Sequence, residues 1–334
     1  MIGGYSFQGN MMTILVTGAA GFIGSYLCHY LLDRGDEVVG VDDLNDYYDP
    51  ALKAARLERL TGRNGFSFVR ADISDKDALA EAVSGRRIAK VAHLAAQAGV
   101  RYSLENPRAY VRSNLTGHLE ILELCRGLGT VEHLVYASSS SVYGGNEKVP
   151  FSEADPVDHP VSLYAATKKA DELMSHAYAH LYGIKQTGLR FFTVYGPWGR
   201  PDMAYWIFTE AMLKGKPIRV FNDGDMWRDF TYIDDIISGT VAALDHAPAG
   251  KGAPHRIYNI GHNKPERLGR FIDILEEVLG VKAVRQYEPM QPGDVPRTFA
   301  DITAIERDLG FSPKTGLREG LAAFADWYRG YYRI

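Results

Sequence analysis

The chain has 334 residues, of which 37 are Lys or Arg and 41 are Asp or Glu, giving a formal net charge of −4 at pH 7. This balance argues against a protein that binds nucleic acid, because affinity for a phosphate backbone requires a basic surface. No apolar run approaches the ~18 residues of a membrane span, and we interpret residues 1–12 as a disordered leader without signal-peptide character, so the sequence predicts a cytoplasmic protein with no membrane association.

Strands and helices are predicted to alternate along the first 192 residues. The strands are expected at residues 13–16, 37–41, 66–70, 90–94, 133–137 and 187–192, and the helices at 25–34, 76–83, 113–128 and 164–182. The first strand is apolar throughout, which is typical of a strand buried on both faces of a sheet. This alternation predicts an α/β fold built on a doubly wound parallel sheet, the Rossmann fold.

The pattern changes after residue 195. Pro, Gly, Trp and charged residues crowd positions 196–203, as expected for a loop that lines a site. Helices are predicted over 204–215 and 266–280, and one further strand over 258–261. Because the chain is about twice the ~150 residues of a typical domain, it has room for two lobes. We predict a Rossmann domain over 13–195 with returning segments near 229–262, and a smaller, discontinuous second lobe over 196–228 and 263–334.

The cysteines and histidines carry little functional signal. Two cysteines, Cys28 and Cys125, cannot form a disulfide framework or a zinc site by themselves, and we expect both as buried free thiols. The ten histidines show no paired metal-ligand spacing, and His93 is interpreted as structural. The sequence therefore implies no metal.

Three glycines stand between the first strand and the first helix, in the pattern Gly18-x-x-Gly21-x-x-Gly24. Glycine is required at such a junction because the backbone turns tightly and approaches a pyrophosphate closely, and the helix N-terminus then offers free N–H groups to the phosphates. A glycine triplet alone is also compatible with an ordinary tight turn, but the GxxGxxG spacing is the variant found in short-chain dehydrogenases.

Asp42 strengthens the prediction of a dinucleotide site, because it ends the second strand 18 residues after Gly24. A carboxylate there accepts hydrogen bonds from both hydroxyls of an adenosine ribose and repels a 2′-phosphate, which favours NAD over NADP. Asp72 follows the third strand, where it either contacts the adenine amine or caps the next helix.

Tyr164 and Lys168, spaced i and i+4, share one face of the predicted helix 164–182. A neighbouring ammonium stabilises a phenolate, so this pair suits a tyrosine that removes a proton near neutral pH. The spacing arises readily by chance in a chain with 20 tyrosines, and it gains meaning from the serines at 138–141, which follow an apolar strand. A hydroxyl at the carboxyl end of that strand is placed to bond the same substrate oxygen.

Together with Arg228-Asp-Phe-Thr-Tyr-Ile-Asp-Asp, these motifs resemble the extended short-chain dehydrogenase family of nucleotide-sugar epimerases and dehydratases, from Met12 to the C-terminus. The segments 42–50 (DDLNDYYDP), 97–103 (QAGVRYS) and 195–203 (YGPWGRPDM) resemble the UDP-glucuronate 4-epimerases in particular. The resemblance implies C4 epimerisation of UDP-glucuronate to UDP-galacturonate through a transient 4-keto sugar, with NAD as a tightly held cofactor.

The resemblance also implies roles for individual residues. Ser139 is implied as the catalytic serine with Ser141 as a second hydroxyl near C4, Tyr164 as the base, Lys168 as its partner, Arg228 as a ligand of the UDP phosphates, and Asp294 as a residue on the nucleotide side. Gln291 departs from the pattern, because it stands where UDP-galactose epimerases carry a phosphate-binding arginine. We further expect the cofactor site to include Phe22, Ile23, Asn45, Ile73, Leu94, Ala95, Ala96, Tyr164 and Lys168, and the substrate site to include Gln97.

A uronate substrate raises a chemical difficulty, because a C4 ketone and a C5 carboxylate form a β-keto acid that loses CO₂ easily. Arg200 offers a planar fork suited to bidentate carboxylate binding, and Thr193 adds a hydroxyl donor. The resemblance places both against the carboxylate. Without it, Arg200 suits a surface ion pair and Thr193 an ordinary strand end.

Other functions stay open at this point. A UDP-glucuronate decarboxylase differs from the epimerase only in the pose of one carboxylate, and another nucleotide-sugar 4-epimerase differs only in its sugar. Dehydratases of this family carry an Asp-Glu pair where this chain has Ser140 and Ser141, so elimination lacks its acid and base. A catalytically silent NAD-binding protein has no need to keep the serine, tyrosine and lysine together.

Many relatives form homodimers through two helices of each subunit. By this resemblance, the helices predicted near 113–128 and 164–182 are candidates for a dimer interface.

Overall fold

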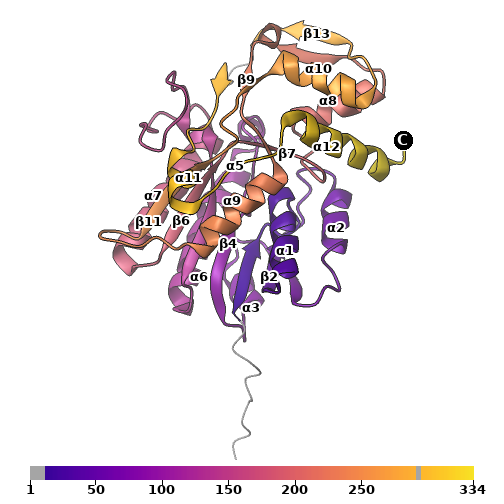
Figure 1. The fold of residues 1–334 in the computed structure, drawn as a ribbon. Helices are drawn as coiled ribbons and strands as arrows, with labels where there is room; N and C mark the ends of the chain where they lie inside the picture. Colours follow the sequence, from indigo (N-terminus) through magenta and orange to yellow (C-terminus); the bar gives the residue numbers. More distant parts are fainter. Residues whose placement is uncertain (1–11, 291–294) are drawn as a thin grey trace, which may run out of the picture.

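The structure is a computed structural model that describes residues 12–290 and 295–334 (Figure 1). Of the predicted leader at 1–12, all but Met12 lies outside the described residues, as do Gln291 and Asp294. Within the described part of the chain, no helix is both long enough and apolar enough to cross a bilayer.

A seven-stranded sheet with the order β11-β6-β5-β4-β1-β2-β3 forms the centre of the fold (Figure 1). Its strands are β1 (Thr13–Thr17), β2 (Glu37–Asp42), β3 (Phe66–Arg70), β4 (Ile88–His93), β5 (His133–Ser139), β6 (Gln186–Phe191) and β11 (His255–Ile260). All neighbouring pairs in this sheet are parallel. The strand order reverses between β1 and β4, which is where a doubly wound sheet opens a crevice at the carboxyl ends of its strands. The predicted Rossmann sheet is confirmed.

Side chains that alternate along the strands build one apolar core on each face of the sheet. On β1, Ile14 and Val16 belong to one core and Leu15 to the other. The first core is covered by α1 (Phe22–Arg34), α9 (Ile233–Asp245) and α11 (Thr303–Leu309), and the second by α3 (Lys76–Ala82), α6 (Gly117–Leu128) and α7 (Leu163–Tyr182). Cys28 lies in the first core and Cys125 in the second, both as buried free thiols, as expected.

A second lobe packs beyond the carboxyl ends of the strands, at the top of Figure 1. Its helices are α8 (Ala204–Leu213), α10 (Leu268–Leu279) and α12 (Leu317–Tyr332), and they share a core of their own. Trp206 contacts Phe324 and Trp327 of α12, and it is only 2% exposed. The lobe also contains the paired strands β8 (Ile218–Phe221) and β13 (Arg285–Glu288), and the small sheet of β12 (Glu266–Arg267), β9 (Trp227–Arg228) and β14 (Arg297–Thr298).

Several elements differ from the sequence prediction. Helix α1 begins at Phe22 rather than Ser25, so the glycine-rich turn runs directly into the helix. The predicted helix 113–128 is divided into a π-helical segment, Val111–Thr116, and α6. The helices α2 (Pro50–Glu58), α9 and α12 were not predicted. Residues 300–311 fall within the segment assigned to the second lobe, yet Ala300, Ile305 and Phe311 pack in the core of the sheet.

Candidate active site

A cavity of about 450 Å³ opens at the carboxyl ends of the strands. It is lined by every site residue predicted from the sequence, apart from Asp294, which lies outside the described residues. These residues are Gly18, Gly21, Phe22, Ile23, Gly24, Asp42, Asn45, Asp72, Ile73, Leu94, Ala95, Ala96, Gln97, Ser139, Ser141, Tyr164, Lys168, Thr193, Arg200 and Arg228. The structure therefore brings together side chains from residue 18 to residue 228 at one surface.

At one end of the cavity, the turn after β1 has no space for side chains. Gly18 has φ +74°, and a Cβ at Gly24 would lie 2.0 Å from the carbonyl oxygen of Gly18. Helix α1 starts immediately after Gly21, which provides no side-chain cap for the first N–H groups. An uncapped helix N-terminus beside a close backbone turn is suited to bind a pyrophosphate. This end of the cavity therefore fits the diphosphate of NAD.

Asp42 occupies the end of β2, where the ribose carboxylate was predicted. Its carboxylate accepts hydrogen bonds from the backbone N–H of Ala20 (3.1 Å) and of Leu44 (2.9 Å). Burial raises the pKa of Asp42, whereas nearby Lys53 and these N–H donors lower it. The carboxylate is thus held in one orientation beside the cavity, as recognition of a ribose requires.

Lys53 of α2 also lines this end of the cavity, although the sequence analysis did not single it out. It is 5% exposed and donates a hydrogen bond to Oδ1 of Asn45 at 2.8 Å. Burial lowers the pKa of Lys53, whereas Asp42 and Asp43 raise it. Its position eleven residues after Asp42 depends on how α2 folds back, which no local motif reveals.

Asp72 does not cap the helix that follows β3. The cap of α3 is Asp75, whose side chain accepts from the N–H groups of Asp77 and Ala78. Asp72 instead accepts from the backbone N–H of Ser74 at 2.8 Å and pairs with Arg112 at 2.6 Å. The helix-capping alternative is therefore wrong, and Asp72 remains at the cavity wall.

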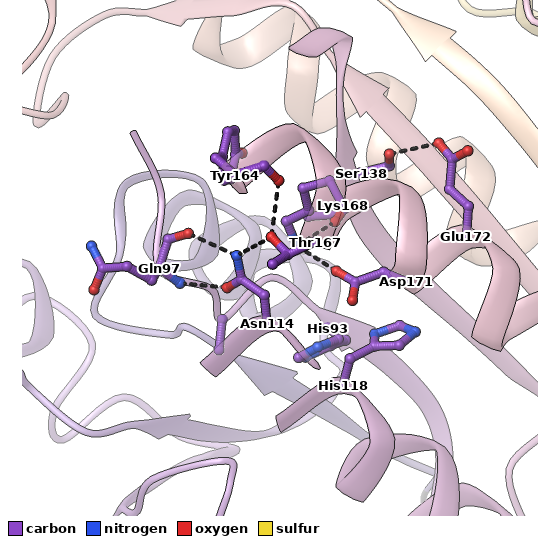
Figure 2. A network of polar contacts seen from close by, with 12 residues as sticks. His93, Gln97, Asn114, His118, Ser138, Tyr164, Thr167, Lys168, Asp171 and Glu172 are labelled. Atoms are coloured by element: carbon purple, nitrogen blue, oxygen red, sulfur yellow. Dashed lines mark hydrogen bonds and ion pairs between the residues drawn. The ribbon is translucent and has the colours of Figure 1, made fainter. Parts of the chain in front are cut away.

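Tyr164 and Lys168 both line the cavity from the first turns of α7 (Figure 2). The ammonium of Lys168 donates to the carbonyl oxygen of Ala137 at 2.9 Å and to Oδ2 of Asp171 at 3.0 Å. Lys168 is only 3% exposed. Burial raises the pKa of Asp171 to about 6, whereas Lys168 lowers it. Asp171 was not predicted, and its i+3 spacing from Lys168 was the available signal.

The four serines at 138–141, two at the end of β5 and two just after it, differ in their contacts. Ser138 lines the cavity, but its hydroxyl donates to the buried Glu172 at 2.7 Å (Figure 2). Glu172 in turn pairs with the buried Arg190 at 2.8 Å. Ser139 and Ser141 instead bond each other at 3.1 Å and face the cavity. The hydroxyl of Ser138 is therefore engaged by a buried carboxylate, and Ser139 and Ser141 stay the predicted substrate-contacting serines.

A buried amide links the loop after β4 to the helix of the tyrosine. Asn114 lies in the π-helical segment and exchanges hydrogen bonds with the backbone of Gln97, accepting at 2.8 Å and donating at 3.1 Å. It also donates to Thr167 at 3.0 Å, and the hydroxyl of Thr167 donates to the carbonyl oxygen of Tyr164 at 2.9 Å. Figure 2 shows this chain of contacts. Gln97 is thus fixed relative to Tyr164.

The cavity is also lined by Thr193 of β7 (Thr193–Tyr195), Arg200 of the following loop, and Arg228 of β9. Arg200 forms a two-pronged ion pair with Asp202, with Nε–Oδ1 at 3.0 Å and Nη2–Oδ2 at 2.5 Å. The loop ion pair considered as an alternative for Arg200 is therefore present, and the same residue also lines the cavity. The hydroxyl of Tyr47 donates to Asp202 at 3.0 Å.

The fold and this cavity define an enzyme of the short-chain dehydrogenase type that uses a dinucleotide. Residues 14–261 match the model of the NAD dependent epimerase/dehydratase family, and the chain belongs to this family.

Relatives with known names share this fold over almost the whole chain. The chain is 51% identical over 335 residues to UDP-glucuronate 4-epimerase 4 from Arabidopsis thaliana, covering 97% of this chain and 76% of the plant protein. The UDP-glucuronic acid 4-epimerase from Bacillus cereus, solved with UDP-glucuronic acid and NAD, is 38% identical with a TM-score of 0.88, covering 96% of this chain and 100% of that one.

A UDP-glucose 4-epimerase from Thermotoga maritima, solved with UDP-glucose, reaches a TM-score of 0.87 at 32% identity, covering 96% of this chain and 100% of that one. Because the two TM-scores are nearly equal, the backbone fold does not distinguish an epimerase that acts on a uronate from one that acts on a neutral sugar. The side chains in the cavity must do so.

Proposed function

We propose that this protein is an NAD-dependent UDP-glucuronate 4-epimerase that converts UDP-glucuronate to UDP-galacturonate. The observation that carries the proposal is that Arg200 and Thr193 line the same cavity as Tyr164, Lys168 and Ser139. A fork-shaped cation at the sugar end of the cavity suits a carboxylate and has no corresponding partner on a neutral hexose. The identity of 51% to a UDP-glucuronate 4-epimerase supports the same assignment.

Bound NAD would supply a hydride acceptor at C4 and a hydride donor to the opposite face of the 4-keto sugar. Tyr164, as the phenolate, takes the proton of the C4 hydroxyl and becomes the neutral phenol, and it gives the proton back in the return step. Ser139 and Ser141 donate hydrogen bonds to the same sugar oxygen. The positive charge of Lys168 favours the phenolate form of Tyr164 before the proton is taken. Arg228 binds the diphosphate, so the sugar turns about this fixed point and presents its other face.

Retention of the carboxylate is the second requirement of the reaction. The 4-keto uronate loses CO₂ when the bond to its carboxylate aligns with the carbonyl π system. Arg200, through a bidentate contact, and Thr193, through its hydroxyl, hold the carboxylate out of that alignment. The epimerase therefore differs from a decarboxylase in how tightly this one group is oriented.

The experiment that tests the proposed function is NMR of the purified protein with UDP-glucuronate and no added NAD. We expect UDP-galacturonate to accumulate without CO₂ release, with the cofactor carried by the protein. Formation of a UDP-pentose or a UDP-4-keto-pentose as the main product would identify a decarboxylase instead. No turnover even with added NAD would exclude UDP-glucuronate as the substrate.

The proposal extends to a homodimer joined through α6 and α7. Large apolar side chains are exposed on these helices, among them Leu173 at 60% and Leu181 at 65% on α7 and Leu119 at 36% on α6. Exposed apolar side chains gathered on neighbouring helices are typical of an interface. Light scattering should give twice the mass of one chain, and Leu173→Glu should reduce it to the mass of a monomer. A monomeric wild-type protein would contradict this assembly.

We place the protein in the cytoplasm. Two buried free thiols, Cys28 and Cys125, are compatible with a reducing compartment. Fractionation of the source cells tests this location.

A further inference from the structure

The guanidinium of Arg200 is held by Asp202, and Asp202 is held in turn by a residue from a distant part of the chain. The guanidinium pairs with Asp202, two residues further along the same loop, and Asp202 also accepts a hydrogen bond from Tyr47 at 3.0 Å. Tyr47 belongs to the loop between β2 and α2, 155 residues away from Asp202 in the sequence. Arg200 and Tyr47 line the cavity, so this group, which we name the Arg200 clamp (Tyr47, Arg200 and Asp202), forms part of its wall.

The surrounding backbone is shaped to admit the clamp. Gly99 has φ +100°, and a Cβ there would lie 2.6 Å from the hydroxyl of Tyr47 and 3.7 Å from Oδ2 of Asp202. The hydroxyl of Tyr110 donates to the carbonyl oxygen of Ala98 at 2.8 Å and so holds the same loop. The ring of Tyr110 in turn packs edge to face against Tyr164 at 5.9 Å. Tyr110 therefore connects the loop beside the clamp to the residue that we propose as the base.

The charges in the clamp are arranged for a fixed orientation. Burial raises the pKa of Asp202, but Arg200 and Tyr47 lower it, and the net pKa lies below the ordinary value. Burial and the Asp202 carboxylate both raise the pKa of Tyr47, so its hydroxyl stays protonated and remains a donor. Arg200 and Tyr164 line the same cavity.

The geometry leaves part of the guanidinium available. Arginine has five N–H donors, and Asp202 occupies one on Nε and one on Nη2. The edge formed by Nη1 and Nη2 has the spacing to bind a second carboxylate with two parallel hydrogen bonds. Because Asp202 already orders the long side chain of Arg200, binding a carboxylate on the other edge costs less conformational entropy.

We propose that Asp202 and Tyr47 are positioning residues that aim Arg200 at the C5 carboxylate, and that they determine both the preference for uronates and the retention of CO₂; this rests on the proposed function. The clamp acts only through Arg200 and therefore affects only substrates that carry the carboxylate. A residue with a merely structural role would change the binding of uronates and neutral sugars alike.

The test compares two ligands in a background without turnover. In Tyr164→Phe protein with NAD bound, the Kd values of UDP-glucuronate and UDP-glucose are measured with and without Asp202→Asn. We expect Asp202→Asn to weaken UDP-glucuronate about tenfold while leaving UDP-glucose within about twofold, because a hydrogen bond that orients a charged group is lost. Tyr47→Phe should shift the same ratio in the same direction by a smaller factor.

Activity provides a second readout. In the otherwise wild-type enzyme, Asp202→Asn and Tyr47→Phe should raise the share of decarboxylated UDP-pentose, and they should raise KM for UDP-glucuronate more than they lower kcat. The matched control is Tyr102→Phe, because the Tyr102 ring packs on Tyr47 at 4.7 Å while its hydroxyl bonds Asn106 rather than Asp202. This control should leave both the Kd ratio and the product ratio unchanged.

Three results would contradict the proposed role of the Arg200 clamp. An unchanged ratio of Kd values in both variants would show that Arg200 needs no anchor, and equal weakening of both ligands would show a structural role. Tighter binding of UDP-glucuronate by Asp202→Asn would show that Asp202 competes with the substrate instead of orienting Arg200. A wild-type enzyme that forms no UDP-galacturonate defeats the proposed function, whereas a wild-type epimerase with unchanged variants defeats only the clamp.

Discussion

The two ends of the cavity are built in different ways. The cofactor end comes largely from one continuous stretch, from Gly18 to Ala96, and much of its shape is backbone: a turn without space for Cβ atoms and an uncapped helix N-terminus. The sugar end is assembled from side chains as distant as Ser139, Arg200 and Arg228. A cofactor shared by many enzymes is thus bound by a conformation, whereas the substrate is bound by particular side chains on loops.

The largest expected effect comes from removing the proposed base at the sugar end. Tyr164→Phe keeps the ring that packs against Tyr110 but removes the oxygen that takes the proton. We expect kcat to fall by about 10²–10⁴, the usual contribution of a general base. Bound NAD, measured by absorbance after denaturation, should remain at the wild-type level, since the cofactor end is untouched. Retention of more than about a tenth of the wild-type rate would contradict the assignment.

The corresponding change at the cofactor end is Gly24→Ala. Its Cβ would lie 2.0 Å from the carbonyl oxygen of Gly18, so α1 must move away from the turn that receives the pyrophosphate. We expect NAD to bind at least about tenfold more weakly, as overpacking of this kind displaces backbone. Gly330→Ala on α12 is the control, because no atom lies within 4 Å of its Cβ. Equal NAD affinity in both variants would show that backbone shape does not determine this end.

Arg200→Lys tests whether the sugar end depends on the shape of one side chain, because it changes the geometry of a positive charge without removing it. Lysine has no planar fork and cannot make the two-pronged contact that Arg200 makes with Asp202. We expect KM for UDP-glucuronate to rise about tenfold and UDP-pentose to appear as a by-product, detected by NMR. NAD content should not change. If no UDP-pentose forms, the proposed protection of the carboxylate by Arg200 is wrong.

The smallest effect concerns the stability of the second lobe, away from the cavity. Glu276 of α10 is 7% exposed and accepts from Lys282 at 2.6 Å and from Arg285 at 2.9 Å. Burial raises its pKa, but these two donors and the backbone N–H of Ala283 lower it more, to about 2. Because the pKa is depressed in the folded state, this carboxylate stabilises the fold above its ordinary pKa of 4.5, and the stabilisation is lost as the pH falls toward 2.

Glu276→Gln should therefore lower the free energy of unfolding by about 1–2 kcal/mol at pH 7. This is less than the pKa difference alone implies, because solvent around the exposed Lys282 screens the ion pair. The difference from wild type should shrink as the pH falls below about 4.5. Urea unfolding at pH 7 and pH 4 measures both values. Turnover at pH 7 should be unchanged, and a pH-independent difference in stability would exclude the carboxylate as the cause.

Much of the cofactor end was predictable because its determinants are local. The spacing of Gly18, Gly21 and Gly24, followed by Asp42, specifies a turn, a helix start and a strand end within one βαβ unit. Backbone conformations set by neighbouring residues do not depend on the rest of the fold. The start of α1 was misplaced only because a helix that begins on glycine lacks a side-chain cap to mark it.

The serines at 138–141 show a limit of prediction from local sequence, because the sequence does not tell which hydroxyl is free to contact a substrate. Ser138 and Ser139 are equivalent in the sequence and both line the cavity, but the hydroxyl of Ser138 donates to the buried Glu172, whereas that of Ser139 donates to Ser141. The family resemblance identified Ser139, and only the structure shows why Ser138 is unsuited. Lys53 was missed for a similar reason, since its contact with Asn45 depends on how α2 folds back. Asp171 is different, because its partner Lys168 lies three residues away on the same helix and the spacing was visible in the sequence.

The sequence by itself determined the class of fold, the cofactor and the set of residues that converge on one cavity, because regular periodicity and short motifs encode local backbone geometry. Only the tertiary structure shows which side chains contact one another at the sugar end of the cavity. Tyr47 and Asp202 lie in two of the segments that carry the family resemblance, but they are 155 residues apart and nothing in the sequence pairs them. Their contact exists because loops after different elements of a parallel sheet meet at the same edge, which is a property of the whole fold and of no single segment.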